Sequence, residues 1–112
     1  MGLDTTHGCY NGSYSAFNQW RSRVCQEIGL GDIYTYEGFG GSKRWPPVSS
    51  EPLVSLLNHW DGDGILKWQE CDAMADRLDS IVNNMGQFKE VTEQWIEGLR
   101  LAYESQENVE FN

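Results

Sequence analysis

The sequence has 112 residues, of which 17 are acidic and 8 are basic, so its formal net charge is −9. The length suits one domain with a modest hydrophobic core, and five Trp, five Tyr and four Phe are too many for a disordered acidic tail. This charge disfavours direct binding to nucleic acid, because the chain would repel phosphate. No apolar run is long enough to span a bilayer. We therefore expect residues 1–112 to form a single domain that does not bind membranes.

The first predicted helix covers residues 13–28. Ser13 or Ser15 can cap its start, and Gly29 can end it in the left-handed conformation. Its apolar residues recur at intervals of three and four and form one stripe, which consists of Phe17, Trp20, Val24 and Ile28.

Residues 29–50 form a long connection that is rich in glycine and aromatic residues. Its segment 33–36 has the residues of a short strand, and turns are expected at 38–42 and 45–47. A second, short helix is expected over residues 50–58, with Ser50 as the N-cap and Pro52 in the first turn.

A third helix is predicted over residues 68–83 and a fourth over 87–104, each with an apolar stripe at helical spacing. Residues 108–112 could form a strand that pairs with 33–36. The sequence thus predicts a mainly α (α+β) fold, a small four-helix domain with a minor two-stranded β element.

All of the net negative charge lies in the second part of the chain, residues 51–112. Residues 1–50 contain four acids and four bases, whereas residues 51–112 contain 13 acids and four bases. Solvated helix faces are the ordinary explanation, and a docking surface for a basic partner protein is the functional one. The candidate partner-binding residues on the third and fourth helices are Asp72, Asp76, Asp79, Glu90, Glu93 and Glu97.

The segment 59–70 resembles the EF-hand calcium loop, in which oxygen ligands surround a sharp turn made by glycine at position six. If Gly64 takes that position, then Asp61, Asp63 and Glu70 fall at positions three, five and twelve. Ile65 would offer its backbone carbonyl at position seven. The resemblance predicts an EF-hand-like loop between the second and third helices.

The loop departs from the EF-hand pattern at position one, where His59 replaces aspartate. Imidazole suits zinc better than calcium. The other histidine, His7, could join His59, Asp61 and Asp63 in a four-coordinate zinc site. An Asp-Gly turn without metal, and a surface position for His7, are the alternatives. We expect one divalent ion, with zinc slightly favoured over calcium, and His7, His59, Asp61, Asp63 and Glu70 as candidate ligands.

The opening MGLDTTH, the His-x-Asp-x-Asp-Gly loop and the ending Val109-Glu110-Phe111 together resemble a family of small bacterial and phage proteins. Small acidic phage proteins of this kind include anti-CRISPR inhibitors. The resemblance implies a phage-encoded, metal-binding protein that inhibits a basic nucleic-acid enzyme such as a CRISPR-Cas nuclease.

Two other functions fit the same loop: a calcium-responsive regulatory module, and a small metal-dependent hydrolase in which Glu70 acts as the base. Three cysteines without a CxxC motif favour free thiols, and the start shows no secretion signal, so we expect a cytoplasmic protein. Oligomeric state is left open.

Overall fold

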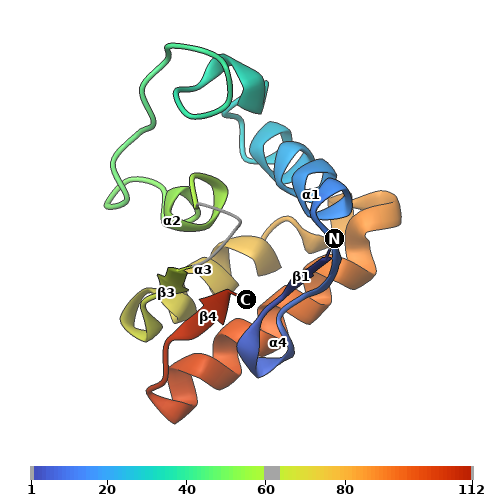
Figure 1. Ribbon diagram of the computed structural model, residues 1–112, viewed down its shortest axis with the longest axis vertical. Helices are drawn as coiled ribbons and strands as arrows, with labels where there is room; N and C mark the ends of the chain where they lie inside the picture. The colour runs from blue at the N-terminus through green and yellow to red at the C-terminus, as the bar shows by residue number, and fades with distance from the viewer. Residues whose placement is uncertain (1, 60–63, 112) are drawn as a thin grey trace.

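The computed structural model describes residues 2–59 and 64–111. In this part of the chain, four α-helices and two antiparallel two-stranded sheets confirm the predicted mainly α, α+β fold (Figure 1). The elements in chain order are β1 (Gly2–Asp4), β2 (Asn11–Ser13), α1 (Tyr14–Glu27), α2 (Val54–Leu57), β3 (Gly64–Leu66), α3 (Trp68–Asp79), α4 (Lys89–Ser105) and β4 (Val109–Phe111). Within the described ranges, no helix is both long and apolar enough to cross a membrane.

Helix α1 begins and ends as its sequence predicts. The side chain of Ser13 accepts a hydrogen bond from the amide of Ala16. At the other end Gly29 has φ +86°, and the amides of Gly29 and Leu30 donate to the carbonyls of Gln26 and Cys25. This pair of bonds satisfies carbonyls that the helix end leaves open.

The connection after α1 contains no strand at residues 33–36, so that prediction was wrong. Residues Ile33–Thr35 form a 3-10 turn (η2), in which the carboxylate of Asp32 accepts from the amide of Tyr34. The backbone carbonyl of Asp32 accepts from the Thr35 amide as well. Short-range bonds to an aspartate that caps the turn therefore replace an extended conformation.

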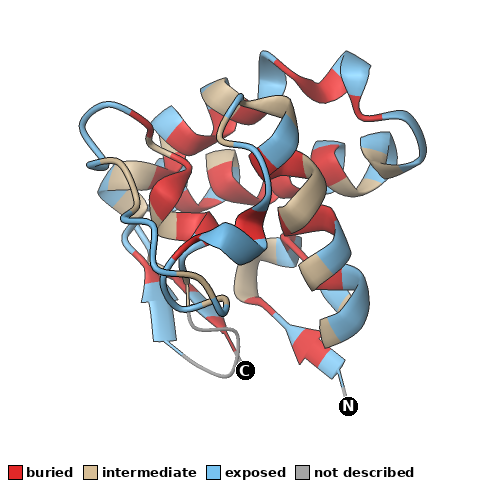
Figure 2. Ribbon diagram, turned by 90° about the horizontal axis from the view of Figure 1, so that it is seen from above, coloured by how far each residue is buried: buried red, intermediate tan, exposed pale blue. Residues whose placement is uncertain are grey.

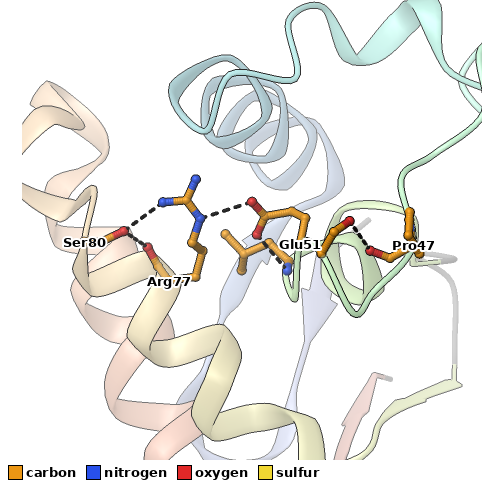
Figure 3. A network of polar contacts seen from close by, with 6 residues as sticks. Pro47, Glu51, Arg77 and Ser80 are labelled. Atoms are coloured by element: carbon orange, nitrogen blue, oxygen red, sulfur yellow. Dashed lines mark hydrogen bonds and ion pairs between the residues drawn. The ribbon is translucent and has the colours of Figure 1, made fainter.

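Helix α2 is shorter than predicted, because residues 50–53 are not helical and Ser50 does not cap it. Glu51 fixes this entry instead. One of its carboxylate oxygens accepts from the Leu53 amide, and the other lies 3.1 Å from Nε of Arg77 on α3 (Figure 3). The end of the long connection is thus attached to α3.

The core lies between the four helices and the terminal strands, and Figure 2 shows the buried residues on the inward sides of the helices. The Trp20 and Trp95 rings stack with centroids 5.2 Å apart and an interplanar angle of 7°. The indole N–H of Trp20 donates to Oγ1 of Thr92 at 2.9 Å. Phe17 and Phe111 extend this aromatic cluster.

The C-terminal strand forms as predicted but has a different partner. β4 pairs with β3, in the register Gly64 to Phe111 and Leu66 to Val109. β3 belongs to segment 59–70, which was compared with the EF-hand loop. The C-terminal strand β4 therefore lies beside this segment. Asn108, just before β4, accepts from the Trp68 amide through its side chain and so caps α3 from a distance.

The β1–β2 hairpin was not predicted. Between its strands, the hydroxyl of Thr5 accepts from the Tyr10 amide at 2.9 Å and donates to the Tyr10 carbonyl. Thr5 also forms an isolated bridge to Phe111, which joins the N-terminal hairpin to β4. Both ends of the described chain are therefore attached to one another.

Helices α3 and α4 pack along each other. α3 ends at Asp79 rather than at residue 83, because the chain continues through a 3-10 turn, η3 (Val82–Asn84). α4 ends at Ser105 and is followed by Gln106 with φ +54°. This left-handed residue redirects the chain toward β4.

Candidate metal and partner-binding sites

His59 lies at the point where α2 leads into the predicted metal loop. Its Nε2 lies 3.0 Å from the carbonyl oxygen of Ile65 on β3, and its ring stacks on Phe111 with centroids 4.0 Å apart. Gly64 has φ +106°, and a Cβ at this position would come within 3.4 Å of the imidazole. The residues at positions one, six and seven of the EF-hand comparison thus lie together.

This geometry fixes the tautomer of the neutral His59 ring. A carbonyl oxygen only accepts hydrogen bonds, so Nε2 must carry the proton and Nδ1 must hold the lone pair. Nδ1 is buried and has no hydrogen-bond partner within the described ranges. A buried acceptor without a partner requires an explanation, and a bound cation is one.

Glu70 lies in the first turn of α3, where the EF-hand comparison places position twelve. One of its carboxylate oxygens accepts from the hydroxyl of Ser55 on α2 at 2.9 Å. Glu70 also lines a surface cavity of about 770 Å³ together with Ile65 and Trp68. The other two predicted loop ligands, Asp61 and Asp63, lie outside the described residues.

His7 lies in a 3-10 turn, η1 (Thr6–Gly8). Its φ is +63°, a backbone conformation that is uncommon for residues other than glycine. Its Nε2 is 3.0 Å from a carboxylate oxygen of Glu107, and its Nδ1 is 2.9 Å from the hydroxyl oxygen of Thr6. The amide of Glu110 donates to the same hydroxyl. Both ring nitrogens thus have partners, and His7 would have to leave Glu107 before binding a metal through Nε2.

The described side chains alone include no group of three or more His, Cys, Asp or Glu that could hold a metal ion. A complete site at the loop therefore requires Asp61 and Asp63 beside His59. The four-ligand zinc site that includes His7 stays a prediction.

A buried arginine that was not predicted from the sequence lies next to His59. The guanidinium of Arg21 donates to the carbonyl of His59 at 2.7 Å and to that of Leu57 at 3.4 Å. It lies over the rings of Phe17 and Phe39, 4.5 and 5.0 Å from their centroids. The sequence feature that could have indicated its burial is the position of Arg21 within the apolar stripe of α1. The Arg21 guanidinium places a positive charge where the loop begins. This charge favours nearby carboxylates and opposes the binding of a cation.

Three of the six candidate partner-binding residues lie along one side of α3, at the helical spacing of four and three. Asp72, Asp76 and Asp79 have carboxylate oxygens 3.5, 3.0 and 3.9 Å from the guanidinium of Arg100 on α4. Their side chains are 46%, 66% and 63% exposed. One guanidinium therefore serves three solvent-exposed carboxylates.

The other three candidates, Glu90, Glu93 and Glu97, are exposed on α4 and share its side with Arg100. Glu93 and Glu97 line a groove of about 200 Å³ together with Asp79 of α3. The acids of the two helices therefore meet on one surface. We call this surface the acidic face, and it comprises Asp72, Asp76, Asp79, Glu90, Glu93 and Glu97.

The three thiols are buried and unsuited to nucleophilic chemistry. Burial raises the pKa of Cys9 from 9.0 to about 12, with the nearby Cys71 adding to the shift. Burial likewise raises the pKa values of Cys25 and Cys71 to about 11. At neutral pH all three are protonated, and the thiolate is the reactive form.

Comparison of the chain with protein-family models, with curated proteins and with solved structures found no match.

Proposed function

We propose that this protein is a non-enzymatic module that docks through its acidic face on a basic partner protein. One observation carries the proposal: exposed carboxylates from two packed helices meet on one surface, whereas the described ion pairs supply only Arg100 as a counter-charge. Like charges that lie this close repel one another, and a basic partner would relieve that repulsion.

The class of partner that fits this surface is a nucleic-acid enzyme whose basic groove normally holds phosphate. An acidic protein that occupies such a groove competes with nucleic acid and thereby inhibits the enzyme. This agrees with the resemblance to small phage proteins, and a CRISPR-Cas nuclease is an example of such a partner. Electrostatic attraction would also accelerate the encounter between the two proteins.

A second proposal concerns the loop between α2 and α3, where a divalent ion would bind His59 through Nδ1. The favouring observation is the buried Nδ1 lone pair, combined with the bond from Nε2–H to the Ile65 carbonyl. A histidine that binds a metal through one nitrogen usually donates from the other to a carbonyl or carboxylate. An imidazole ligand favours zinc.

Calcium would use the loop differently. An EF-hand ion takes the carbonyl oxygen at position seven as a ligand, and here that oxygen belongs to Ile65 and already accepts from His59. The positive charge of Arg21 beside the loop would lower the affinity for any cation. An ion bound at this loop, whether zinc or calcium, would have a structural role, because it would bind only the folded loop and so stabilise it.

The docking proposal is tested with a defined basic probe, a fluorescein-labelled peptide of nine arginines, by fluorescence anisotropy. We expect binding that weakens steeply as salt is added, because exposed charges are screened. The pair Glu90→Lys and Glu97→Lys should abolish binding. The control pair Asp4→Lys and Glu37→Lys changes the net charge equally on exposed residues outside the acidic face.

The control pair should retain most of the affinity if the acidic face is the docking surface. An equal loss in both pairs would mean that only the net charge matters, and the docking proposal would then be wrong. Absence of binding by the unmodified protein at low salt would overturn it as well.

A further inference from the structure

We infer that the groove between the end of α3 and α4 receives an arginine side chain of the partner protein. The inference rests on the docking function proposed above and adds the chemical group that the acidic face recognises. The groove is lined by Asp79, Val82, Glu93, Ile96 and Glu97 and has a volume of about 200 Å³.

The walls of the groove match the two parts of an arginine side chain. Val82 and Ile96 are mostly buried, with 7% and 9% of their surface exposed, and they supply an apolar surface for the methylene groups. Asp79, Glu93 and Glu97 are exposed and supply carboxylates for the guanidinium. A planar fork of N–H donors can bridge two carboxylates, which a lysine ammonium does less well.

Arg100 shows that the surface between α3 and α4, next to the groove, already binds a guanidinium. From α4 it reaches Asp76 at 3.0 Å and Asp72 at 3.5 Å, and Asp79 lies at the far edge of its reach, at 3.9 Å. The groove begins at Asp79 and continues along α4. An arginine from a partner would therefore repeat, next to Arg100, an arrangement that the fold itself contains.

The carboxylates of the groove have little compensation from the chain. None of the ion pairs found among the described residues involves Glu93 or Glu97. These two glutamates are four residues apart on α4, a spacing at which like charges destabilise a helix. A guanidinium between them would remove that repulsion, and this supplies a driving force for binding.

The test uses the whole protein with ¹³C-labelled valine and isoleucine methyl groups. The probe is the capped peptide acetyl-Gly-Arg-Gly-amide, and its counterpart with citrulline keeps the shape without the charge. We expect the methyl signals of Val82 and Ile96 to shift and saturate with the arginine peptide and not with the citrulline peptide. A lysine peptide should bind more weakly.

Two variant pairs with equal net charge locate the binding. The pair Glu93→Gln and Glu97→Gln removes two charges from the groove, and we expect it to weaken binding about tenfold, as loss of a central contact does. The pair Glu90→Gln and Glu104→Gln removes two charges from α4 outside the groove and should weaken binding less than about twofold. The variant Val82→Thr keeps the shape of the wall but makes it polar, and it should weaken binding without any change in charge.

Two results would overturn the inference while leaving the docking function intact: equal losses in the two pairs, or shifts that spread over the acidic face and do not saturate. If the unmodified protein binds neither this peptide nor the nine-arginine peptide at low salt, the docking function fails as well.

Discussion

Nε2 of His59 donates a hydrogen bond to the carbonyl oxygen of Ile65 at 3.0 Å, across the loop that joins α2 to α3. This contact keeps the imidazole against Phe111 and leaves the buried Nδ1 as an acceptor. It connects the end of α2 to β3 and, through the β3–β4 pairing, to the C-terminal strand. The described residues that precede and follow residues 60–63 are therefore both held by the rest of the fold.

Removal of His59 should abolish zinc binding, whereas removal of His7 should not. We expect elemental analysis of the purified protein to find zinc lost in His59→Ala and retained in His7→Ala, because both His7 nitrogens already contact Thr6 and Glu107. Loss of zinc in both variants would instead support the four-ligand site. An unmodified protein that takes up no added metal would contradict the metal proposal.

Gly98 on α4 should not tolerate alanine. A Cβ at this position would lie 2.7 Å from Cα of Cys9 and 2.8 Å from its backbone nitrogen, and backbone cannot move aside as a flexible side chain can. We expect Gly98→Ala to lower the free energy of unfolding by about 1–3 kcal/mol, measured by urea denaturation. Leu101→Ala, at an exposed position of the same helix, should change it by less than about 1 kcal/mol. Equal stability of Gly98→Ala and the unmodified protein would contradict this packing.

Gln106 should be replaceable by glycine with a gain in stability. It has φ +54° directly after α4, a conformation that costs a residue with a Cβ more than it costs glycine. We expect Gln106→Gly to raise the free energy of unfolding by about 0.5–1 kcal/mol. The neighbouring Ser105→Gly, inside the helix, should lower it by a similar amount, about 0.5–1 kcal/mol. A loss of stability in Gln106→Gly would show that its side chain has a role that the contacts do not reveal.

The buried thiols should make the fold less stable at alkaline pH. Folding raises their pKa values to about 12 for Cys9 and about 11 for Cys25 and Cys71, so the unfolded chain loses these protons at a lower pH than the folded one. The stabilising contribution is complete below pH 9 and is lost as the pH rises from there toward the folded values. Urea denaturation between pH 8 and pH 11 should show this decline. The slope of the decline should be smaller in Cys25→Ala. An unchanged slope in that variant would show that ionisation of the buried Cys25 thiol does not contribute to the decline.

Local sequence signals predicted the helices well where short-range chemistry decides them. Ser13 and Gly29 define α1 through their own side chain and backbone, so the bounds were within a residue of the observed ones. The strand at 109–111 was also expected. Its partner was not, because pairing with β3 depends on how the domain brings distant segments together, and three-residue strands leave little pattern in a sequence.

In the candidate sites, too, features set by local spacing could be predicted, whereas features set by packing could not. The acids of α3 and α4 follow helical spacing, so their common side on each helix could be predicted. The position of Arg100 between the α3 acids, and the groove over Val82 and Ile96, depend on how the two helices pack. Arg21 was missed because an arginine within an apolar stripe is usually taken to extend to solvent. Here Leu57, at the end of α2, and His59, just after it, offer it backbone carbonyls.

Backbone amide NMR of the whole protein with the nine-arginine peptide shows whether the acidic face is the docking surface. We expect chemical-shift changes at low salt to concentrate in residues 72–79 and 90–97. Residues 14–53, which carry no part of the acidic face, should change little. Shifts that are absent, or that are as large in residues 14–53 as on the acidic face, would show that the acidic face is not the docking surface.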